Sequence, residues 1–478
     1  MSDRLRPRDL ALLIRETGTA PRHNVTVDIL EPGEEGWSHE AFLELVADRL
    51  SFVPRYRQRI RVVPGRLANP VWVDDDRFDL GYHVRRSALP RPGDTDQLRD
   101  LVARIISRPL DRSRPLWEIY VVEGLAQGRV AILSKTHQAL VDGVETVDLG
   151  QLLLDVNPGV EPLGEDDWSP RRASGPRLVF GAVRDTLTGV DTISQTARSV
   201  GGSLARLAAG PLDALTTVSQ LLTGRRPERS TPLTGPLSQQ RLVVTLETRL
   251  EDYRRIRAAH GGTVNDAILA VVAGGLRGWL MTRSESLAGL RQVPAVVPVS
   301  VIDEDLEATA MGSQIAPHVV ELPVGETSPV VRLHQVSYSF ERHQENSRAV
   351  AADRLAGITG FAPGTFHAMG SRVAAEASSD VLLSVCNVPG PQTPRYAAGA
   401  RLVASYPFPP LEPEHALAIG VTSYDGRVCF GLTADRDLVP DAEVVGQCLR
   451  EALDELLDTI NARRRAPRGR SRKGQPTG

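Results

Sequence analysis

Cysteine is scarce in this chain, and so are segments that would carry it into or across a membrane. The three cysteines, Cys386, Cys429 and Cys448, are scattered without CxxC spacing, so neither a disulfide framework nor a cysteine zinc site is expected. The first residues lack the apolar core of a secretion signal. The longest apolar stretch, Ala267–Leu276, is about half of the ~20 residues that span a bilayer. We therefore expect a cytoplasmic chain that does not cross a membrane.

Lysine is nearly absent, since Lys135 and Lys473 are the only two. No lysine stands in a glycine-rich phosphate loop, and the GxSxG and HExxH motifs are also missing. These absences leave no sequence case for a P-loop NTPase, a serine hydrolase built on that motif or a zinc peptidase. The formal net charge of -3 offers no concentrated basic surface to nucleic acid. We predict no nucleic-acid partner, no metal and no permanently bound cofactor.

The length of 478 residues is more than one hydrophobic core usually supports, so two domains are expected. Residues 1–160 mix strand and helix patterns, for example the alternating strand-like run Asn24–Glu31. Residues 237–462 repeat this mixture and end in an amphipathic helical pattern. Between them, residues 161–236 are rich in proline, glycine and charge around one amphipathic helix, which indicates a linker. The arginine-rich residues 463–478 are predicted to form a disordered basic tail.

Two of these segments have two interpretations each. The amphipathic helix of the linker, residues 179–207, either docks on a core or lies on a membrane or lipid droplet. The basic tail is either solvated or attracted to anionic lipid, at roughly 1 kcal/mol per basic residue near the surface. Peripheral contact with the inner membrane face or with lipid droplets is therefore an expectation beside a purely cytoplasmic location.

The most informative stretch is Lys135–Gly143, which reads K-T-H-Q-A-L-V-D-G. It follows an apolar, strand-like run, Val130–Leu133. The stretch thus gathers His137, Gln138 and Asp142 at the end of a predicted strand. Proton transfer from an alcohol needs a base, and a neutral imidazole with an ordinary pKa near ~6.5 suits that task at cellular pH. Alone this spacing is a weak signal, because a histidine at a strand end is more often structural than catalytic; the motifs that accompany it favour a catalytic site.

Further motifs accompany this stretch in a characteristic order. They are Pro115-Leu116-Trp117, Asn265-Asp266, Val297-Pro298-Val299-Ser300, Asn387-Val388-Pro389-Gly390-Pro391 and Ser423-Tyr424-Asp425-Gly426. With them the chain resembles the bacterial wax ester synthase/acyl-CoA:diacylglycerol acyltransferase family, from about Leu5 to Ile460. The resemblance implies an α/β (mixed α+β) fold of two chloramphenicol-acetyltransferase-like domains with a tunnel at their interface. It also implies an O-acyltransferase that moves a fatty acyl group from the co-substrate acyl-CoA to diacylglycerol or to a long-chain alcohol.

The resemblance assigns roles to individual residues as well. The family's two adjacent histidines fall on His137 and Gln138, and the second of them is the general base. Asp142 would hold the motif loop through an arginine, and Asn265 would polarise the thioester oxygen. The other residues that the resemblance implies for substrate binding are Gly143, Asp266, Ser300 and Asn387.

Gln138 raises a question of mechanism, because an amide cannot accept a proton near neutral pH, although it can hydrogen-bond an alcohol. A general base typically contributes ~10²–10⁴-fold in rate. Three hypotheses stay open: His137 is displaced and serves as the base, the site runs slowly without a base, or the chain binds acyl-CoA or lipid without turnover. Neighbouring residues on an extended strand face opposite ways, which counts against the first hypothesis. The alternative functions are thus a weak or silent homologue and an acyltransferase for a small polar alcohol.

Overall fold

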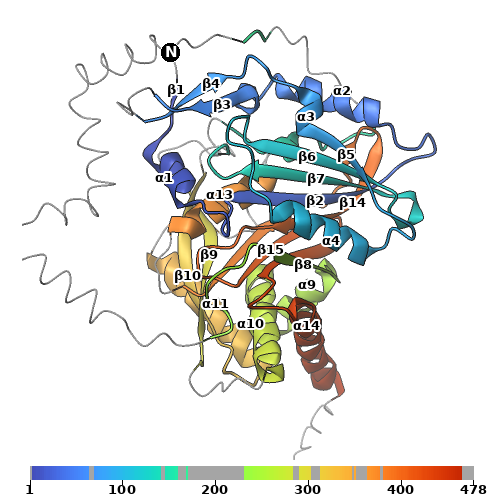
Figure 1. Ribbon diagram of the computed structural model, residues 1–478. Coiled ribbons are helices and arrows are strands. Elements are labelled where there is room, and N and C mark those ends of the chain that lie inside the picture. Colours follow the sequence, from blue (N-terminus) through green and yellow to red (C-terminus); the bar gives the residue numbers. More distant parts are fainter. Residues whose placement is uncertain are drawn as a thin grey trace, which may run out of the picture.

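The structure is a computed structural model, and it consists of two lobes that each contain a β-sheet with helices packed against it (Figure 1). It describes residues 3–63, 69–141, 146–159, 168–170, 231–283, 290–302, 313–346, 349–350, 363–376 and 381–465. The N-terminal lobe is mainly blue to cyan in Figure 1, with the orange strand β14 beside β2, and the C-terminal lobe is mainly green to red. This mixed α/β architecture is the fold class that the sequence predicts.

The N-terminal lobe contains a six-stranded sheet in the order β13-β14-β2-β7-β6-β5. The strand β7 (Val130–His137) is antiparallel to β2 (His23–Glu31) on one side and to β6 (Trp117–Glu123) on the other. Every residue of β7 is buried, both its apolar first half, Val130–Leu133, and its polar second half, which ends at His137. The remaining strands are β5 (Val84–Ala88), β13 (Tyr396–Ala397) and β14 (Ala400–Phe408).

Helices cover both faces of this sheet. The helix α4 (Thr95–Ile106) begins with a capping box between Asp94 and Gln97, and its apolar stripe packs on one face. The helix α2 (His39–Leu50) begins at the N-cap Ser38 and packs on the opposite face. Smaller elements complete the lobe: a three-stranded sheet of β1 (Asp3–Arg4), β4 (Val71–Asp74) and β3 (Gln58–Arg61), the helices α1 (Pro7–Arg15), α3 (Leu80–His83) and α5 (Leu149–Leu152), and the 3-10 turns η1 (Pro54–Arg57) and η3 (Ala126–Gly128).

The C-terminal lobe contains a seven-stranded sheet in the order β10-β9-β12-β15-β16-β8, with β11 paired to β9. Its strands are β8 (Arg241–Arg249), β9 (Val293–Ile302), β10 (Ser313–Leu322), β11 (Ala349–Val350), β12 (Leu383–Pro389), β15 (Leu417–Tyr424) and β16 (Arg427–Asp435). The helices packed with this sheet are α9 (Leu250–His260), α10 (Val264–Thr282), α11 (Pro329–Asn346) and α14 (Ala442–Arg465).

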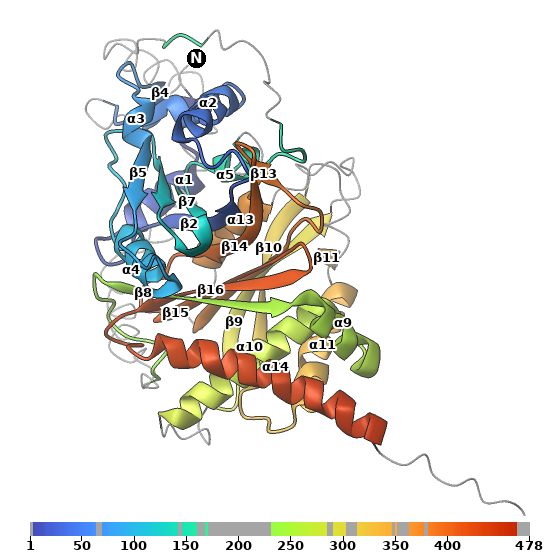
Figure 2. The same cartoon turned by 90° about the vertical axis from the view of Figure 1, so that its right-hand side faces the viewer.

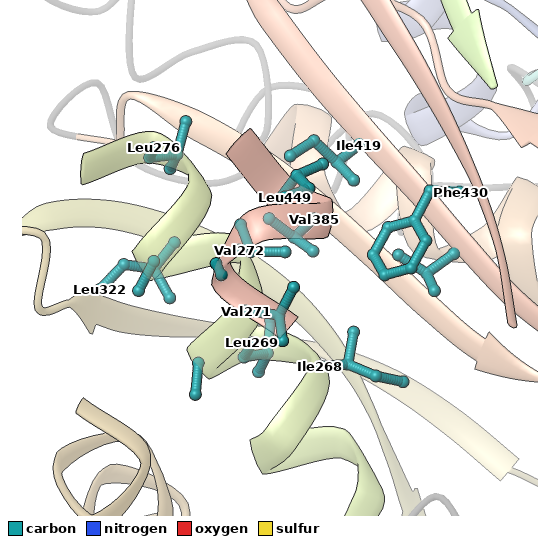
Figure 3. Packing of buried hydrophobic residues seen from close by; sticks show 14 of the residues in the cluster. Ile268, Leu269, Val271, Val272, Leu276, Leu322, Val385, Ile419, Phe430 and Leu449 are labelled. Atoms are coloured by element: carbon teal, nitrogen blue, oxygen red, sulfur yellow. The ribbon is translucent and has the colours of Figure 1, made fainter. Parts of the chain in front are cut away.

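The largest hydrophobic core lies between this sheet and the helices α10 and α14 (Figure 3). Figure 3 labels part of it: Ile268, Leu269, Val271, Val272, Leu276, Leu322, Val385, Ile419, Phe430 and Leu449. Burying each such side chain contributes about 1.5–3 kcal/mol. The helix α10 is long and apolar enough to span a membrane by length and composition, but 72% of its apolar window is buried inside the molecule. Its hydrophobicity is thus explained by the core that it helps to form.

The strand β14 joins the two lobes. It comes late in the chain, yet it pairs with β2 of the N-terminal sheet, while the next strands, β15 and β16, belong to the C-terminal sheet. Near its end the carbonyl oxygen of Pro407 lies against Gly420 of β15 and Gly431 of β16, which are directly paired. A Cβ atom at these two glycines would lie 2.3 and 2.2 Å from that oxygen. Only residues without a side chain permit this close approach.

The helix α13 (Pro363–Glu376) also links the lobes, and it lies between them in Figure 2. It contacts β9, β10 and β12 of the C-terminal sheet, and it contacts β2 and α5 of the N-terminal lobe. The predicted N-terminal domain ended at residue 160, and the C-terminal domain began at residue 237. The strands β13 and β14 come after residue 237 and yet belong to the N-terminal sheet, which the prediction did not foresee. A linear sequence pattern does not show which sheet a late strand joins.

Two further predictions concern the linker and the tail. The predicted linker helix, residues 179–207, lies outside the described residues, as does most of the predicted tail. The helix α14 extends to Arg465, so residues 463–465 are helical and the prediction that the tail begins at residue 463 was wrong there. Arginine has a high helix propensity, and α14 simply continues through these residues.

The glycine pair under β14 leads to a stability prediction. The substitution Gly431→Ala should lower the free energy of unfolding by about 1–3 kcal/mol or more, because its methyl group would meet backbone rather than a movable side chain. Urea unfolding followed by tryptophan fluorescence measures this. The matched control is Gly33→Ala, since nothing lies within 4 Å of a Cβ at that position. Equal stability of the two variants would show that β14 can shift freely at the crossing.

Candidate functional site

The predicted site lies where β7 ends. The backbone N–H of His137 donates to the carbonyl of Leu116 at 3.0 Å, and the N–H of Gln138 donates to the carbonyl of Arg22 at 2.9 Å. A turn follows at once, since the N–H of Leu140 donates to the carbonyl of His137 at 2.9 Å. Backbone hydrogen bonds thus place His137 and Gln138 at the end of the central strand β7, on the side of the sheet where α13 lies.

The side chain of His137 points into the N-terminal lobe. Its Nδ1 accepts a hydrogen bond from the backbone N–H of Ala139 at 3.0 Å, so in the neutral ring the proton is on Nε2. Nε2 lies 3.6 Å from Oε2 of Glu16, and the His137 side chain is fully buried. The ring is therefore hydrogen-bonded at Nδ1, whereas Nε2 faces the Glu16 carboxylate without a hydrogen-bond partner in the described part of the chain.

Glu16 responds to this neighbour. Burial alone would raise the pKa of Glu16, but the neighbouring His137 ring, whose Nε2 lies 3.6 Å away, together with hydrogen bonds from Arg112 and the backbone N–H of Arg22, lowers it well below the ordinary value. Glu16 is therefore ionised across the physiological range. Its negative charge stabilises the form of His137 that carries the proton on Nε2. The contact therefore favours a role for His137 in positioning the motif rather than in catalysis.

The backbone of Gln138 is hydrogen-bonded, whereas its side-chain amide is not. The residue is fully buried, and neither Nε2 nor Oε1 of the amide has a hydrogen-bond partner in the described part of the chain. An unpartnered buried amide costs about 1–3 kcal/mol. A substrate hydroxyl that hydrogen-bonded this amide would remove that cost. Because Gln138 has no exposed surface, substrate entry requires the surrounding side chains to move apart.

Arg372 of α13 holds the motif from the other lobe. Its Nη1 donates to the carbonyl of Gln138 at 3.0 Å and to the carbonyl of Val141 at 2.8 Å. Its Nη2 forms an ion pair with Asp9 of α1, which is buried. One guanidinium thus connects the motif, the N-terminal helix and the helix between the lobes. Sequence reasoning missed Arg372 and Asp9, because neither stands in a recognisable motif.

The structure brings two of the predicted substrate-binding residues together. Nδ2 of Asn387, on β12, donates to Oδ1 of Asn265 at the start of α10, at 2.9 Å. Asp266 instead begins the helix: it forms a capping box with Thr263 and accepts a hydrogen bond from Ser337 at 2.9 Å. Burial raises its pKa, and the hydrogen bonds partly offset this.

The other predicted residues are placed only in part. Ser300 belongs to β9, where it pairs with Ile315 of β10 and Val350 of β11. Asp142 and Gly143 lie outside the described residues. Within the described part of the chain, no three His, Cys, Asp or Glu side chains gather as they would around a metal ion.

A small cavity of about 40 Å³ lies between the lobes, next to α5 and α13, and its lining surface is mainly apolar. Its acidic and basic lining residues are Asp28 of β2, Asp148 before α5 and His367 of α13. The hydroxyl-bearing residues of its lining are Thr26, Ser405, Thr422, Ser423 and Tyr424. Neither His137 nor Gln138 lines it. Sequence reasoning did not find this cavity, because its residues come from six separate segments.

Burial dominates the electrostatics of this cavity. It raises the pKa of Asp28 to about 7, with a further increase from the charge of Asp148 and a decrease from a hydrogen bond with Ser405. Burial also raises the pKa of Asp148 to about 6. It lowers the pKa of His367 to about 3, although a hydrogen bond with the backbone of Val421 favours the protonated ring. The histidine is therefore neutral at cellular pH, and of the two carboxyl groups Asp28 keeps its proton the more readily.

Comparison with protein families gives two matches. Residues 5–268 match the wax ester synthase/diacylglycerol acyltransferase catalytic domain, and residues 311–457 match the WS/DGAT C-terminal domain. Together they include β7 and α13, which meet at the motif.

Comparison with individual proteins agrees. The chain is 30% identical over 432 residues to a Mycobacterium tuberculosis protein named "Probable diacylglycerol O-acyltransferase tgs1", with 90% of each chain covered. It is 40% identical over 268 residues to the similarly named tgs3 of that organism, covering 54% of this chain and 97% of the relative.

Solved structures share the fold. The wax ester synthase/diacylglycerol acyltransferase from Marinobacter aquaeolei VT8 matches with a TM-score of 0.65 and 24% identity, covering 96% of this chain and 99% of that one. The first condensation domain of the calcium-dependent antibiotic synthetase matches with a TM-score of 0.53 and 15% identity, at 96% coverage of each chain.

The buried carboxyl group of Asp28 leads to a prediction about pH. Its folded-state pKa of about 7 exceeds the ordinary 3.8, so the folded state keeps a proton that the unfolded chain has lost. Stability should therefore fall as pH rises from about 4 to about 7. Asp28→Asn removes this loss, and it should be more stable than the natural protein by roughly 2–4 kcal/mol at pH 8 and by less at pH 5.

Thermal or urea unfolding at several pH values measures the stability difference. Asp454→Asn, at an exposed position of α14, is the matched control and should show no growing difference. A constant difference between Asp28→Asn and the natural protein from pH 4 to pH 8 would contradict the prediction.

Proposed function

The chain belongs to the wax ester synthase/diacylglycerol acyltransferase family, and from this premise we propose that it transfers a fatty acyl group from acyl-CoA to the hydroxyl of diacylglycerol or of a long-chain alcohol. Family membership places it among acyltransferases. The observation that carries the substrate proposal is the match over residues 5–268, which includes the strand β7 and the motif at its end.

The geometry supports transfer at this place. The reaction needs two substrates to meet in one orientation, and correct orientation alone supplies a large part of the rate enhancement in such reactions. Arg372 of α13 holds the backbone of Gln138, so residue 138 lies where elements of both lobes meet. In the proposed step the alcohol oxygen attacks the thioester carbon, the C–S bond breaks, and the alcohol proton ends on the thiol of coenzyme A.

Gln138 has a limited part in this step. Its Oε1 can accept a hydrogen bond from the alcohol and orient the oxygen toward the thioester, but it cannot take the proton. We therefore favour the hypothesis of a slow site that works by orientation. The contacts of His137 with Ala139 and Glu16 favour this over a displaced base, because both ring nitrogens already face protein atoms.

The proposal also concerns the location of the protein and its contact with lipid surfaces. We propose a cytoplasmic protein that meets its lipid substrates at the inner membrane face or at lipid droplets. Such an acceptor is insoluble in water, which supports peripheral contact with a lipid surface. Flotation with anionic vesicles at low salt tests this, and complete absence of the protein from the lipid fraction would exclude it.

The alternative function, binding of acyl-CoA or lipid without turnover, is not favoured by the comparisons, because the named relatives are acyltransferases, and Gln138 is the one observation that supports it. An assay with labelled palmitoyl-CoA and either diacylglycerol or hexadecanol separates the two. Formation of labelled triacylglycerol or wax ester supports transfer. Saturable binding of palmitoyl-CoA without product supports the alternative function.

The substitution Gln138→His should raise kcat at least tenfold, because it supplies a base that typically contributes ~10²–10⁴-fold. The measurement is the rate of labelled ester formation at saturating palmitoyl-CoA. The companion variant His137→Ala tests the displaced-base hypothesis, which requires turnover to disappear. If Gln138→His left the rate unchanged, the reaction would not take place at this position.

A further inference from the structure

A second and larger pocket, of about 300 Å³, lies next to the helix α4. Its walls come from both lobes, because α4 contacts β8 of the C-terminal sheet, and Figures 1 and 2 both show these two elements side by side. The buried apolar side chains of its walls include Val27, Ile29, Leu98, Val102, Val243 and Phe408. A volume of this size is at the lower end of the range found for small-molecule sites.

This pocket is separate from the motif and from the small cavity between the lobes. The residues of β2 that line it alternate with those that line the small cavity, so the two lie on opposite faces of the sheet. Val27 pairs with Leu133 of β7, five residues before Gln138, and Ile29 is two residues further from the motif. At ~3.3 Å per residue, this part of the pocket lies about 16–23 Å along the strand from Gln138. The pocket is therefore a candidate site of its own.

The mouth of the pocket is open and charged. Ala126 and Gln127, which line it, are exposed, so a ligand can enter from solvent without movement of the walls. The ionisable residues of the lining are Asp94, Arg99, Arg129, Glu247 and Arg427. Three arginines against two carboxylates leave a formal charge of +1, which favours an anion over a cation.

Arg129 is the arginine of the mouth with donors to spare. Arg99 and Arg427 already form ion pairs with glutamates of the C-terminal lobe. Nη2 of Arg129 lies 3.9 Å from Oε1 of Glu31, too far for a hydrogen bond. Its Nε is buried and has no hydrogen-bond partner in the described part of the chain. Nε and Nη2 are neighbouring donors, and their spacing matches the two oxygens of a carboxylate.

The volume limits the size of the ligand. One water takes about 30 Å³ in the liquid and needs about 10–15 Å³ when enclosed, so the pocket holds about ten to twenty non-hydrogen atoms. A carboxylate on a saturated chain of about eight to sixteen carbons has this size. A nucleotide would bury its phosphates and polar base against apolar walls at a large cost in desolvation.

We propose that this pocket binds a free fatty acid, with the hydrocarbon chain between β2, α4 and β8 and the carboxylate on Arg129. The site goes beyond the proposed acyl transfer, because a free acid is neither the thioester donor nor the alcohol acceptor. The bound acid contacts both lobes, so it stabilises the folded chain in proportion to its affinity.

The first test compares three ligands of one chain length: decanoate, 1-decanol and decyltrimethylammonium. Isothermal titration calorimetry on the full chain, below the concentrations at which these ligands form micelles, gives each Kd. Decanoate should bind at least tenfold more tightly than 1-decanol, because its carboxylate accepts two charge-assisted hydrogen bonds from Arg129. The ammonium should bind most weakly. Equal affinities, or no binding of decanoate, would overturn the proposal.

The second test locates the carboxylate. Arg129→Gln should weaken decanoate binding at least tenfold and leave 1-decanol binding unchanged, whereas a merely structural role of Arg129 would affect both ligands alike. The matched control is Arg254→Gln on α9, because Arg254 also lies near a single glutamate, at 3.8 Å, and does not line the pocket. This control should change neither affinity.

The third test locates the chain. Val403 lines the pocket and is only partly buried, so Val403→Phe fills the space with little overpacking and should weaken both decanoate and 1-decanol binding at least tenfold. Melting curves establish folding of each variant. Unchanged decanoate binding in folded Arg129→Gln or Val403→Phe would mean that the acid binds elsewhere, and the site would be wrong. None of these measurements needs turnover, so a failure of the proposed acyl transfer is recognised separately by the absence of ester.

Discussion

The two lobes can share a site only if their relative position is determined, and the crossing of β14 provides this. The strand is hydrogen-bonded along β2 in one sheet, and its end passes directly over Gly420 and Gly431 in the other. The close contact at Pro407 leaves little freedom for one lobe to slide over the other. Both the motif and the small cavity between the lobes lie at the junction that this strand helps to define.

A second constraint acts within that junction. The guanidinium of Arg372 donates to two backbone carbonyls after β7 and pairs with Asp9, so it holds the motif through main-chain atoms. The position of the motif backbone is therefore independent of the side chains that would carry out the chemistry. The backbone at residue 138 would be held in the same way whichever side chain it carried, and a glutamine there does not require a different fold. His137 adds to the same frame through Glu16 and Ala139.

The sequence predicted the parts of the molecule that depend on local patterns. Alternating residues identified Asn24–Glu31 as a strand, and the structure has β2 at His23–Glu31. The motif was expected at a strand end and lies there, because a buried strand and the turn after it have distinct compositions. The pairing of Asn265 with Asn387, the crossing of β14 and the contacts of Arg372 join residues more than a hundred positions apart. No spacing rule applies at such separations, so these features emerged only from the fold.

The pairing of β14 with β2 has one consequence for any dissection of the chain. A fragment that stopped in the segment between the two sheets would keep β2 but lose the strand that covers its outer side. The main-chain N–H and C=O groups there would face solvent as an open edge, which recruits strands from other molecules. The N-terminal lobe is therefore not a self-contained module: on its own it would be prone to aggregate, and the last third of the chain acts as its intramolecular protection.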